Sequence, residues 1–507
     1  MTATALLPPA QTAARSAPML SRTEATRFLQ RATFGPTPDD VDQLMGEGIE
    51  AWLDRELTTT PNSSIYDLVV RSDKFDQSVW THYLSGNAPL RKRVGYALSQ
   101  IFVVSVPGIN KVPAAAFADL LEAHAFGNYR DLLGAVTKSP AMGQYLTYMG
   151  NRKANPAKGT MPDENYAREI LQLFSIGLER TWRNGWPVRD SNGDPLPAYG
   201  EADVQGLARV FTGWRLDMQA PKPQRYRNEM WHDHRRYENG EKTFLGLTIP
   251  AGVPGPQALD MALDHIAGRR EVGGFISRQL IQRLVTSNPS GPYVKRVIDA
   301  WENDGTGVRG NLGAVVKAIL TDPEATGAAT RRSGKLREPV LRFSAVLKAL
   351  DVSSTQAVFN IRGLQDSATK LGQTPFRSPS VFNFYRPGYV PPQTALAEQG
   401  MVAPEFQIAN EASVIGWTNF LSKFIAFSPN GIKLDRSGLL PLADDPEALV
   451  DEVAARLLGR EMSAETRAIV VDCVGRVSLF RQWTQRIERV NTALVLTAAS
   501  PDFLHEA

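Results

Sequence analysis

The sequence predicts an all-α, or mainly α, protein: a multi-helix globular bundle with one irregular insertion that carries a short β-hairpin. Two observations lead to this prediction. Apolar residues recur at helical spacing in one segment after another, and the connections between these segments are short. The stretch at about 215–255 lacks this spacing, is rich in Arg, Lys and aromatic residues, and contains at 243–249 the best strand or hairpin candidate of the chain.

Composition sets the class of protein. Of the 507 residues, 43% are hydrophobic and 21% are charged, which is typical of a soluble globular protein that can bury a large core. The net charge of +3 and the presence of only short basic runs, such as Arg91–Arg93, argue against nucleic-acid binding. No run of about 18 apolar residues occurs, so we predict no transmembrane segment.

The chain is expected to form one continuous helical domain over 20–507, preceded by a loosely ordered tail at 1–19. The tail is rich in Ala, Pro and Thr and does not have the form of an intact signal peptide. No repeat, low-complexity segment or long linker marks a further boundary. The one cysteine, Cys473, excludes an intrachain disulfide and a Cys-rich zinc site, and its valine neighbours predict that it is buried.

The first two helices carry clear start signals. Ser21 and Glu24 have the spacing of a capping box, which opens a helix that includes Phe28 and Leu29. Gly35 and Pro36 break this helix, and Thr37 then caps a second one that extends through Leu44.

Further helices are predicted along the rest of the chain. A polar loop at 151–161 leads to a central helix, a Gly/Pro/Asp-rich connection spans 178–199, and an aromatic-rich ordered loop spans 375–392. The predicted helical ranges, besides the central helix, are 90–104, 113–125, 130–136, 141–149, 201–211, 259–267, 274–285, 292–301, 312–320, 340–350, 405–424, 446–458, 464–474 and 490–499.

The central helix lies within 162–177. Ala167, Ile170 and Phe174 recur on one stripe that faces a core, and Gly177 is a suitable stop. Arg168 and Glu169 point away from this stripe. On spacing alone these charges form a solvated face.

The chain resembles a bacterial family known as domain of unknown function 1800. The resemblance rests on the blocks at 31–35, 162–177, 208–214 and 232–246, and it extends from about Phe28 to the C-terminal block at 500–503. The family has no established chemistry. Its members are commonly exported, which implies a periplasmic or secreted location, and they are often encoded beside a sulfatase-like companion.

The family blocks single out six polar or aromatic residues as a candidate site. Glu169 and His232 are the candidate acid and base, and the substrate-binding candidates are Arg168, Trp214, Asp233 and Lys242. We expect the insertion to cover the charged face of the central helix and to form a partly enclosed polar site there. The alternative is that these residues only tie the insertion onto the helices.

Two patterns suggest calcium or another divalent metal. Asp190, Asn192, Asp194 and Glu201 occupy positions 1, 3, 5 and 12 of a calcium loop, but the sixth position is Pro195, where that pattern needs Gly. A turn capped by aspartate is the alternative.

A second pattern contains histidine. His232 and His234 alternate along an extended segment, with Asp233 or Glu229 as an oxygen ligand. Without a recognised third ligand this is a weak metal signal.

The functional predictions follow from these sites. No Gly-x-Ser-x-Gly elbow or P-loop is present. We expect an exported enzyme, a hydrolase or lyase, that acts on a polar or anionic polymer such as a polysaccharide by acid/base chemistry. The alternative is a non-catalytic binding or assembly protein, whose partner, by the family resemblance, is the sulfatase-like companion.

Overall fold

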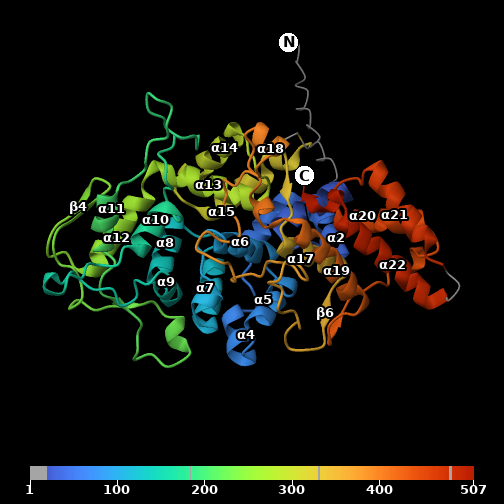
Figure 1. Ribbon diagram of the computed structural model, residues 1–507, viewed down its shortest axis with the longest axis horizontal. Helices are drawn as coiled ribbons and strands as arrows, with labels where there is room; N and C mark the ends of the chain where they lie inside the picture. Colours follow the sequence, from blue (N-terminus) through green and yellow to red (C-terminus); the bar gives the residue numbers. More distant parts are fainter. Residues whose placement is uncertain (1–19, 183, 329, 331, 479–481, 507) are drawn as a thin grey trace, which may run out of the picture.

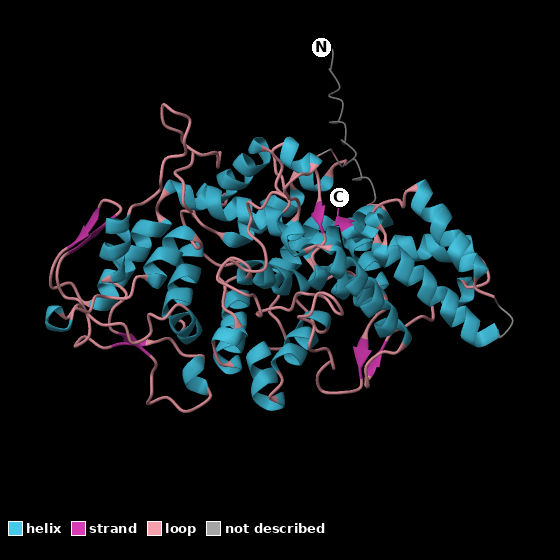
Figure 2. Cartoon of the chain, in the orientation of Figure 1, coloured by secondary structure: helices cyan, strands magenta, loops and turns pink. Residues whose placement is uncertain are grey.

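Helices form most of the regular structure, which confirms the mainly α prediction (Figure 2). The computed structural model describes residues 20–182, 184–328, 330, 332–478 and 482–506. These residues contain 23 α-helices and eight short strands. The predicted N-terminal tail lies outside the described residues.

Every helical range predicted from the sequence overlaps a helix of the structure. The α-helices of the first half are α1 (Arg22–Ala32), α2 (Pro38–Glu47), α3 (Ile49–Thr58), α4 (Ile65–Ser72), α5 (Phe75–Leu84), α6 (Pro89–Ser99), α7 (Lys111–Ala123), α8 (Tyr129–Lys138), α9 (Pro140–Tyr145), α10 (Asn165–Gln172), α11 (Glu201–Ala208) and α12 (Gly255–Ala267). Those of the second half are α13 (Arg270–Leu284), α14 (Gly291–Glu302), α15 (Leu312–Thr321), α16 (Pro323–Thr326), α17 (Pro339–Ala349), α18 (Ala395–Glu398), α19 (Glu411–Ala426), α20 (Pro446–Leu457), α21 (Ala464–Arg476), α22 (Gln482–Ala499) and α23 (Pro501–Leu504).

The strands form four antiparallel pairs. The pairs are β1 (Trp214–Arg215) with β2 (Trp231–His232), β3 (Lys242–Phe244) with β4 (Leu247–Ile249), β5 (Lys335–Leu336) with β8 (His505–Glu506), and β6 (Ser353–Ser354) with β7 (Ile432–Lys433). The β3–β4 pair is the hairpin predicted in the insertion. The β5–β8 pair joins the end of the chain to the segment before α17.

The predicted capping box at Ser21 and the predicted cap at Thr37 are present, and Thr37 also forms a capping box, with Asp40. The Ser21 N–H donates to the Glu24 carboxylate at 2.9 Å, and the Thr37 N–H donates to the Asp40 carboxylate at 2.8 Å. In both boxes the hydroxyl of the first residue accepts the N–H of the third helical residue. These bonds satisfy main-chain donors that a helix start leaves free.

The molecule is elongated (Figure 1). Helices α4 to α7 lie near its middle, α8 to α12 with the β3–β4 hairpin form one end, and α20 to α22 form the other. A single continuous cluster of buried apolar side chains extends from Ala25 to Phe503. Among the described residues, no helix combines the length and apolar character needed to span a bilayer.

Helix α11 lies between the central helix α10 and the β3 strand, and it holds the insertion in place. The insertion also contacts α12 through the β4 strand. At the α11–β3 contact, a Cβ atom on Gly206 would lie 1.9 Å from the carbonyl oxygen of Thr243. Only glycine therefore allows the two backbones to approach this closely. Cys473, which was predicted to be buried, is partly exposed on α21.

Replacing Gly206 by Ala is expected to lower the free energy of unfolding by about 1–3 kcal/mol or more, because the hairpin backbone must move away from α11. The matched control is Gly46→Ala in α2, where an added Cβ meets nothing within 4 Å. That change is expected to raise stability by about 0.5–1 kcal/mol, since alanine restricts the unfolded chain. Urea unfolding measures both. Equal stability of the two variants would contradict the packing of the hairpin on α11.

Candidate functional site

Helix α10 presents Arg168 and Glu169 in different environments. The Arg168 guanidinium is partly exposed and pairs with Glu201 at 3.2 Å and with Glu164 at 3.5 Å. Glu169 is only 7% exposed. The solvated face expected from spacing alone therefore holds for Arg168, whereas Glu169 is covered.

The buried Glu169 carboxyl is incompletely hydrogen-bonded. Its Oε2 atom has no hydrogen-bond partner among the described residues, and burial raises its pKa while the charge of Arg168 opposes that shift. Burial, and secondarily the charge of Glu169, raises the pKa of Tyr145 and Tyr199, so both side chains lie near this carboxyl. The charged groups that act on Glu169 do not include His232.

Trp214 and His232 face each other across the β1–β2 pair. Their rings lie 5.1 Å apart, edge to face, and Tyr237 lies 5.1 Å from the imidazole on another side. Added Cβ atoms on Gly213 and Gly255 would lie 2.8 and 2.0 Å from His232 Nε2, so glycine backbones pack directly against the ring. Burial lowers the pKa of His232, which favours the neutral imidazole.

Lys242 and Asp233 complete the set on the insertion. The buried Lys242 ammonium lies 4.5 Å from the centre of the Tyr237 ring, and burial lowers its pKa to about 8. The Asp233 carboxylate pairs with Arg215 at 3.2 Å and with Arg236 at 3.3 Å.

The structure brings Trp214, His232 and Lys242 into one group: His232 and Lys242 contact Tyr237, and Trp214 contacts His232. Among the described residues it gives no hydrogen bond, ion pair or ring contact between this group and Glu169. The contacts of the group bind the two strand pairs of the insertion to each other, as the structural alternative supposes. A shared site with Glu169 stays a prediction.

The calcium-loop residues belong to the connection between α10 and α11, which projects at the upper left of Figure 1. The Asp190 carboxylate accepts the main-chain N–H groups of Asn192 at 2.8 Å and of Asp194 at 2.9 Å. Glu201 begins α11 and pairs with Arg168. The arrangement is that of a turn capped by aspartate.

No three His, Cys, Asp or Glu residues of the described chain lie close enough together to hold a metal ion. In the histidine pattern, Glu229 pairs with Lys138 at 2.7 Å. Binding of calcium or another divalent metal therefore stays a prediction that these contacts do not favour.

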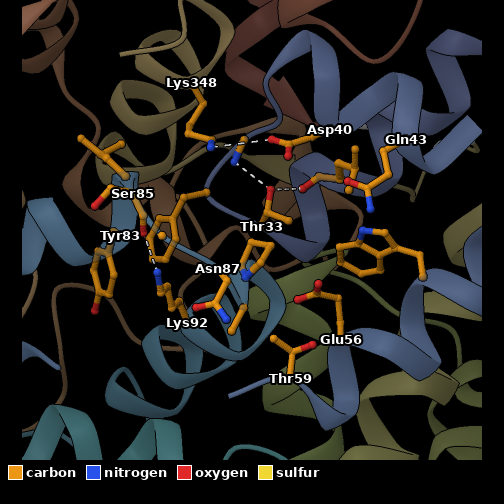
Figure 3. A pocket seen from close by; sticks show the side chains of 18 of the residues that line it. Thr33, Asp40, Gln43, Glu56, Thr59, Tyr83, Ser85, Asn87, Lys92 and Lys348 are labelled. Carbon is orange, nitrogen blue, oxygen red and sulfur yellow. Dashed lines mark hydrogen bonds and ion pairs between the residues drawn. The ribbon is translucent and has the colours of Figure 1, made fainter. Parts of the chain in front are cut away.

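A polar pocket of about 230 Å³ lies among segments that are distant in sequence (Figure 3). Its walls come from the loop between α1 and α2, from α2 and α3, from the connection between α5 and α6, and from the ends of α6 and α17. The polar side chains that line it are Thr33, Asp40, Gln43, Arg55, Glu56, Thr59, Tyr83, Ser85, Asn87, Lys92 and Lys348.

Glu56 and Lys92 are the two buried charged groups of the polar pocket, each 1% exposed. Burial raises the pKa of Glu56 against the opposing charge of Arg55, and its Oε2 atom has no hydrogen-bond partner among the described residues. Burial lowers the pKa of Lys92 to about 8, although the charge of Glu122 opposes the shift. The Lys92 amine donates one hydrogen bond, 2.6 Å long, to the carbonyl of Ser85.

Lys348, Asp40 and Gly35 line another edge of the polar pocket. Lys348 lies 3.6 Å from Asp40, and both are near the top of Figure 3, with Thr33 and Glu56 below them. Gly35 has φ +104°, and an added Cβ would lie 2.6 Å from the Cα atom of Ala345. Only glycine therefore lets this loop lie against α17.

The sequence contained one signal for the polar pocket. Arg91, Lys92 and Arg93 are consecutive on a helix that also has an apolar stripe, so they cannot all point to the solvated side. All three are buried. The run was interpreted only as too short to indicate nucleic-acid binding, so Lys92 was not recognised as a candidate site residue.

An apolar groove of about 420 Å³ lies at the C-terminal end of α10. Ile101, Leu173, Phe275 and Phe382 contribute to its walls, and Leu178 lines it while remaining 59% exposed. Exposed apolar surface of this kind is unusual unless something covers it.

Comparison with known proteins gives one match. A family model described as "Protein of unknown function (DUF1800)" matches residues 27–505, almost the whole chain. No curated protein and no solved structure matches.

Replacing Glu169 by Gln is expected to raise the free energy of unfolding at pH 8, with the difference disappearing near pH 4, where both states bind the proton. The carboxyl pKa is raised by folding, so the parent protein loses stability as pH rises through that pKa, whereas Gln does not titrate. Urea unfolding across this pH range measures the effect. The exposed Glu179→Gln is the control and is expected to show no such rise. A loss of stability in Glu169→Gln at pH 8 would mean that the charge has a partner.

Proposed function

We propose that this chain, which belongs to the DUF1800 family of unknown function, is an enzyme that carries out acid/base chemistry on a polar or anionic group in the polar pocket. One observation carries the proposal. Glu56 and Lys92 line the same pocket, and burial moves the pKa of the acid up and that of the base down. Such opposed shifts within one cleft are characteristic of catalytic sites.

The two groups suit complementary roles. A buried carboxyl with a raised pKa retains its proton more readily and can protonate a leaving oxygen. An amine with a pKa of about 8 is partly neutral at neutral pH and can accept a proton from water or substrate. Glu56 Oε2 has no hydrogen-bond partner among the described residues, so it is the carboxyl oxygen that can bind a substrate.

Lys348 and the size of the polar pocket indicate the substrate class. Asp40 offsets part of the charge of Lys348, but the three basic side chains of the pocket, Arg55, Lys92 and Lys348, outnumber its two acidic ones, which favours a carboxylate or another anionic group. A volume of about 230 Å³ holds roughly eight waters at about 30 Å³ each, enough for one sugar-sized unit. These properties support a hydrolase or lyase that acts on an anionic polysaccharide.

We assign proton transfer to Glu56 and Lys92 rather than to Glu169 and His232. The His232 imidazole is packed between glycine backbones, and no contact among the described residues joins it to Glu169. Glu56 and Lys92, in contrast, line a single pocket.

Binding of a companion protein without catalysis is a second candidate, and the apolar groove is the observation that favours it. Protein interfaces bury aromatic and aliphatic side chains such as Phe275 and Leu178. Under this alternative, Phe275→Glu removes the biological function, whereas changes to Glu56 or Lys92 leave it intact.

Glu56→Gln and Lys92→Met are each expected to lower the rate of polymer cleavage by about 10²-fold or more, because each removes one proton-transfer group while preserving shape. Pectate, alginate and hyaluronate are the test polymers, and release of reducing ends is the measurement. The matched control is Glu50→Gln, an exposed carboxyl on the same helix as Glu56 that pairs with Lys317 at 2.9 Å. It is expected to keep full activity.

The pKa of Lys92 tests the same proposal without a substrate. In protein labelled with ¹³C at lysine Cε, two resonances are expected to titrate near pH 8, those of Lys92 and Lys242, and the one that is missing from Lys92→Met belongs to Lys92. A Lys92 pKa near 10.5, the ordinary value of a lysine, would contradict the proposed base.

A further inference from the structure

A serine, a histidine and a glutamate form a continuous hydrogen-bonded series close to the polar pocket. Ser63 Oγ lies 2.8 Å from His82 Nδ1, and His82 Nε2 lies 2.7 Å from Glu122 Oε2. An ionised carboxylate only accepts hydrogen bonds, so the neutral imidazole places its proton on Nε2 and donates it to Glu122. Nδ1 then carries the lone pair that accepts the Ser63 hydroxyl.

The fold holds these three residues on different elements. Ser63 lies just before α4, His82 on α5 and Glu122 on α7. An added Cβ on Gly95 of α6 would lie 2.4 Å from the Glu122 side chain, so glycine at that position leaves room for the carboxylate. His82 is fully buried and Glu122 is 5% exposed, whereas Ser63 is only half-buried. The serine is therefore the member of the series that is open to solvent.

The neighbouring serine shows a different arrangement. Ser64 Oγ donates to the Asp119 carboxylate at 2.5 Å, which also accepts the N–H groups of Ile65 and Tyr66. Asp119 therefore holds the start of α4 through Ser64 and leaves Ser63 to His82. Among the described residues, the main-chain N–H groups of Ser63 and Ser64 have no hydrogen-bond partner, so two donors lie within one residue of the Ser63 hydroxyl.

We propose that Ser63 is an activated nucleophile for acyl transfer, with His82 as its base and Glu122 as the group that orients and stabilises the imidazole. The substrate class is an ester or another activated acyl compound. The relay of a hydroxyl, an imidazole and a carboxylate defines this chemistry by geometry and role, whatever the order of the residues along the chain.

The proton and electron balance of the proposed reaction is complete. The Ser63 proton moves to His82 Nδ1 while a bond forms between Ser63 Oγ and the acyl carbon. The bond from that carbon to the leaving oxygen breaks, and His82 returns the proton to the leaving group. Water then attacks the acyl-serine by the same route and releases the acid. Glu122 stays ionised throughout and stabilises the imidazolium. Main-chain N–H groups beside the serine are suitable donors to the acyl oxyanion.

This centre is separate from the proposed acid/base pair. Ser63 is not among the residues that line the polar pocket, although Thr59 and Asn87 are, and the N–H of Asn62 donates to Asn87 at 2.8 Å. Reaction at Ser63 requires neither Glu56 nor Lys92, so the two proposals can fail independently.

The test is covalent labelling of the full-length protein by a biotin-tagged fluorophosphonate. Attack by Ser63 forms an O–P bond and releases fluoride, as an acyl group would release its leaving oxygen. Intact mass is expected to show a single adduct, and peptide mapping is expected to place it on Ser63. Ser63→Ala is expected to abolish the adduct, and Glu122→Gln is expected to slow labelling by about 10²-fold or more, because the amide no longer stabilises the imidazolium.

Three further variants distinguish reactivity from structure. Ser64→Ala and Ser85→Ala remove nearby hydroxyls outside the relay and are expected to label at the parental rate, as is Glu50→Gln, a change at an exposed carboxyl. Thermal unfolding of each variant shows whether it folds. Two results would overturn the proposal: no adduct on Ser63 under conditions that fully label trypsin, or equal labelling rates for the parent and a folded Glu122→Gln variant.

Discussion

The carboxylate of Glu338 connects distant segments of the chain in the interior, and the arrangement of the centre depends on it. Glu338 is fully buried just before α17. Its Oε2 atom lies 2.5–3.2 Å from four donors, which are Tyr96 and Gln100 at the end of α6, Gln373, and Tyr385 of the aromatic-rich loop. Desolvating a carboxylate is costly unless such donors replace water. Loss of this group would leave the donors of Tyr96, Gln373 and Tyr385 unpaired and Gln100 with only the Tyr385 hydroxyl, at 3.1 Å. Helices α6 and α17 and the aromatic-rich loop therefore hold one another in position.

Access to a pocket distinguishes Glu56 and Lys92 from other buried charges of this protein. Lys335, with no exposure, pairs with the buried Glu405 at 3.2 Å and also donates to two carbonyls. Glu56 and Lys92 are equally buried: Glu56 pairs with Arg55 at 2.7 Å, and Lys92 donates one hydrogen bond to the carbonyl of Ser85. Burial raises the pKa of Glu56 and lowers that of Lys92. Oε2 of Glu405, like that of Glu56, has no hydrogen-bond partner among the described residues. The difference is that Glu56 and Lys92 line a pocket that a ligand can enter, whereas Lys335 and Glu405 do not line it.

The sequence predicted features that depend on neighbouring residues. The capping box at Ser21, the helix cap at Thr37 and the hairpin at 243–249 follow from local hydrogen bonding and turn preference, and the structure contains them. Helix α5 was not predicted from the sequence. It is buried on nearly all sides, and its buried residues include the polar Ser78 and His82 as well as Phe75, so no single apolar stripe marks it as a helix. The polar pocket was missed for a different reason: Glu56 and Lys348 are separated by almost 300 residues, and no local pattern connects them.

Glu122 is the electrostatic connection between the two candidate centres. Its carboxylate accepts a hydrogen bond from His82, and its charge favours the protonated form of Lys92. When His82 carries a proton during acyl transfer, the imidazolium offsets part of the negative charge that Lys92 experiences. The amine pKa, already lowered by burial, then decreases further. The two centres differ in chemistry but share one buried charge, and Gly95, by leaving space for that charge between α6 and α7, serves both.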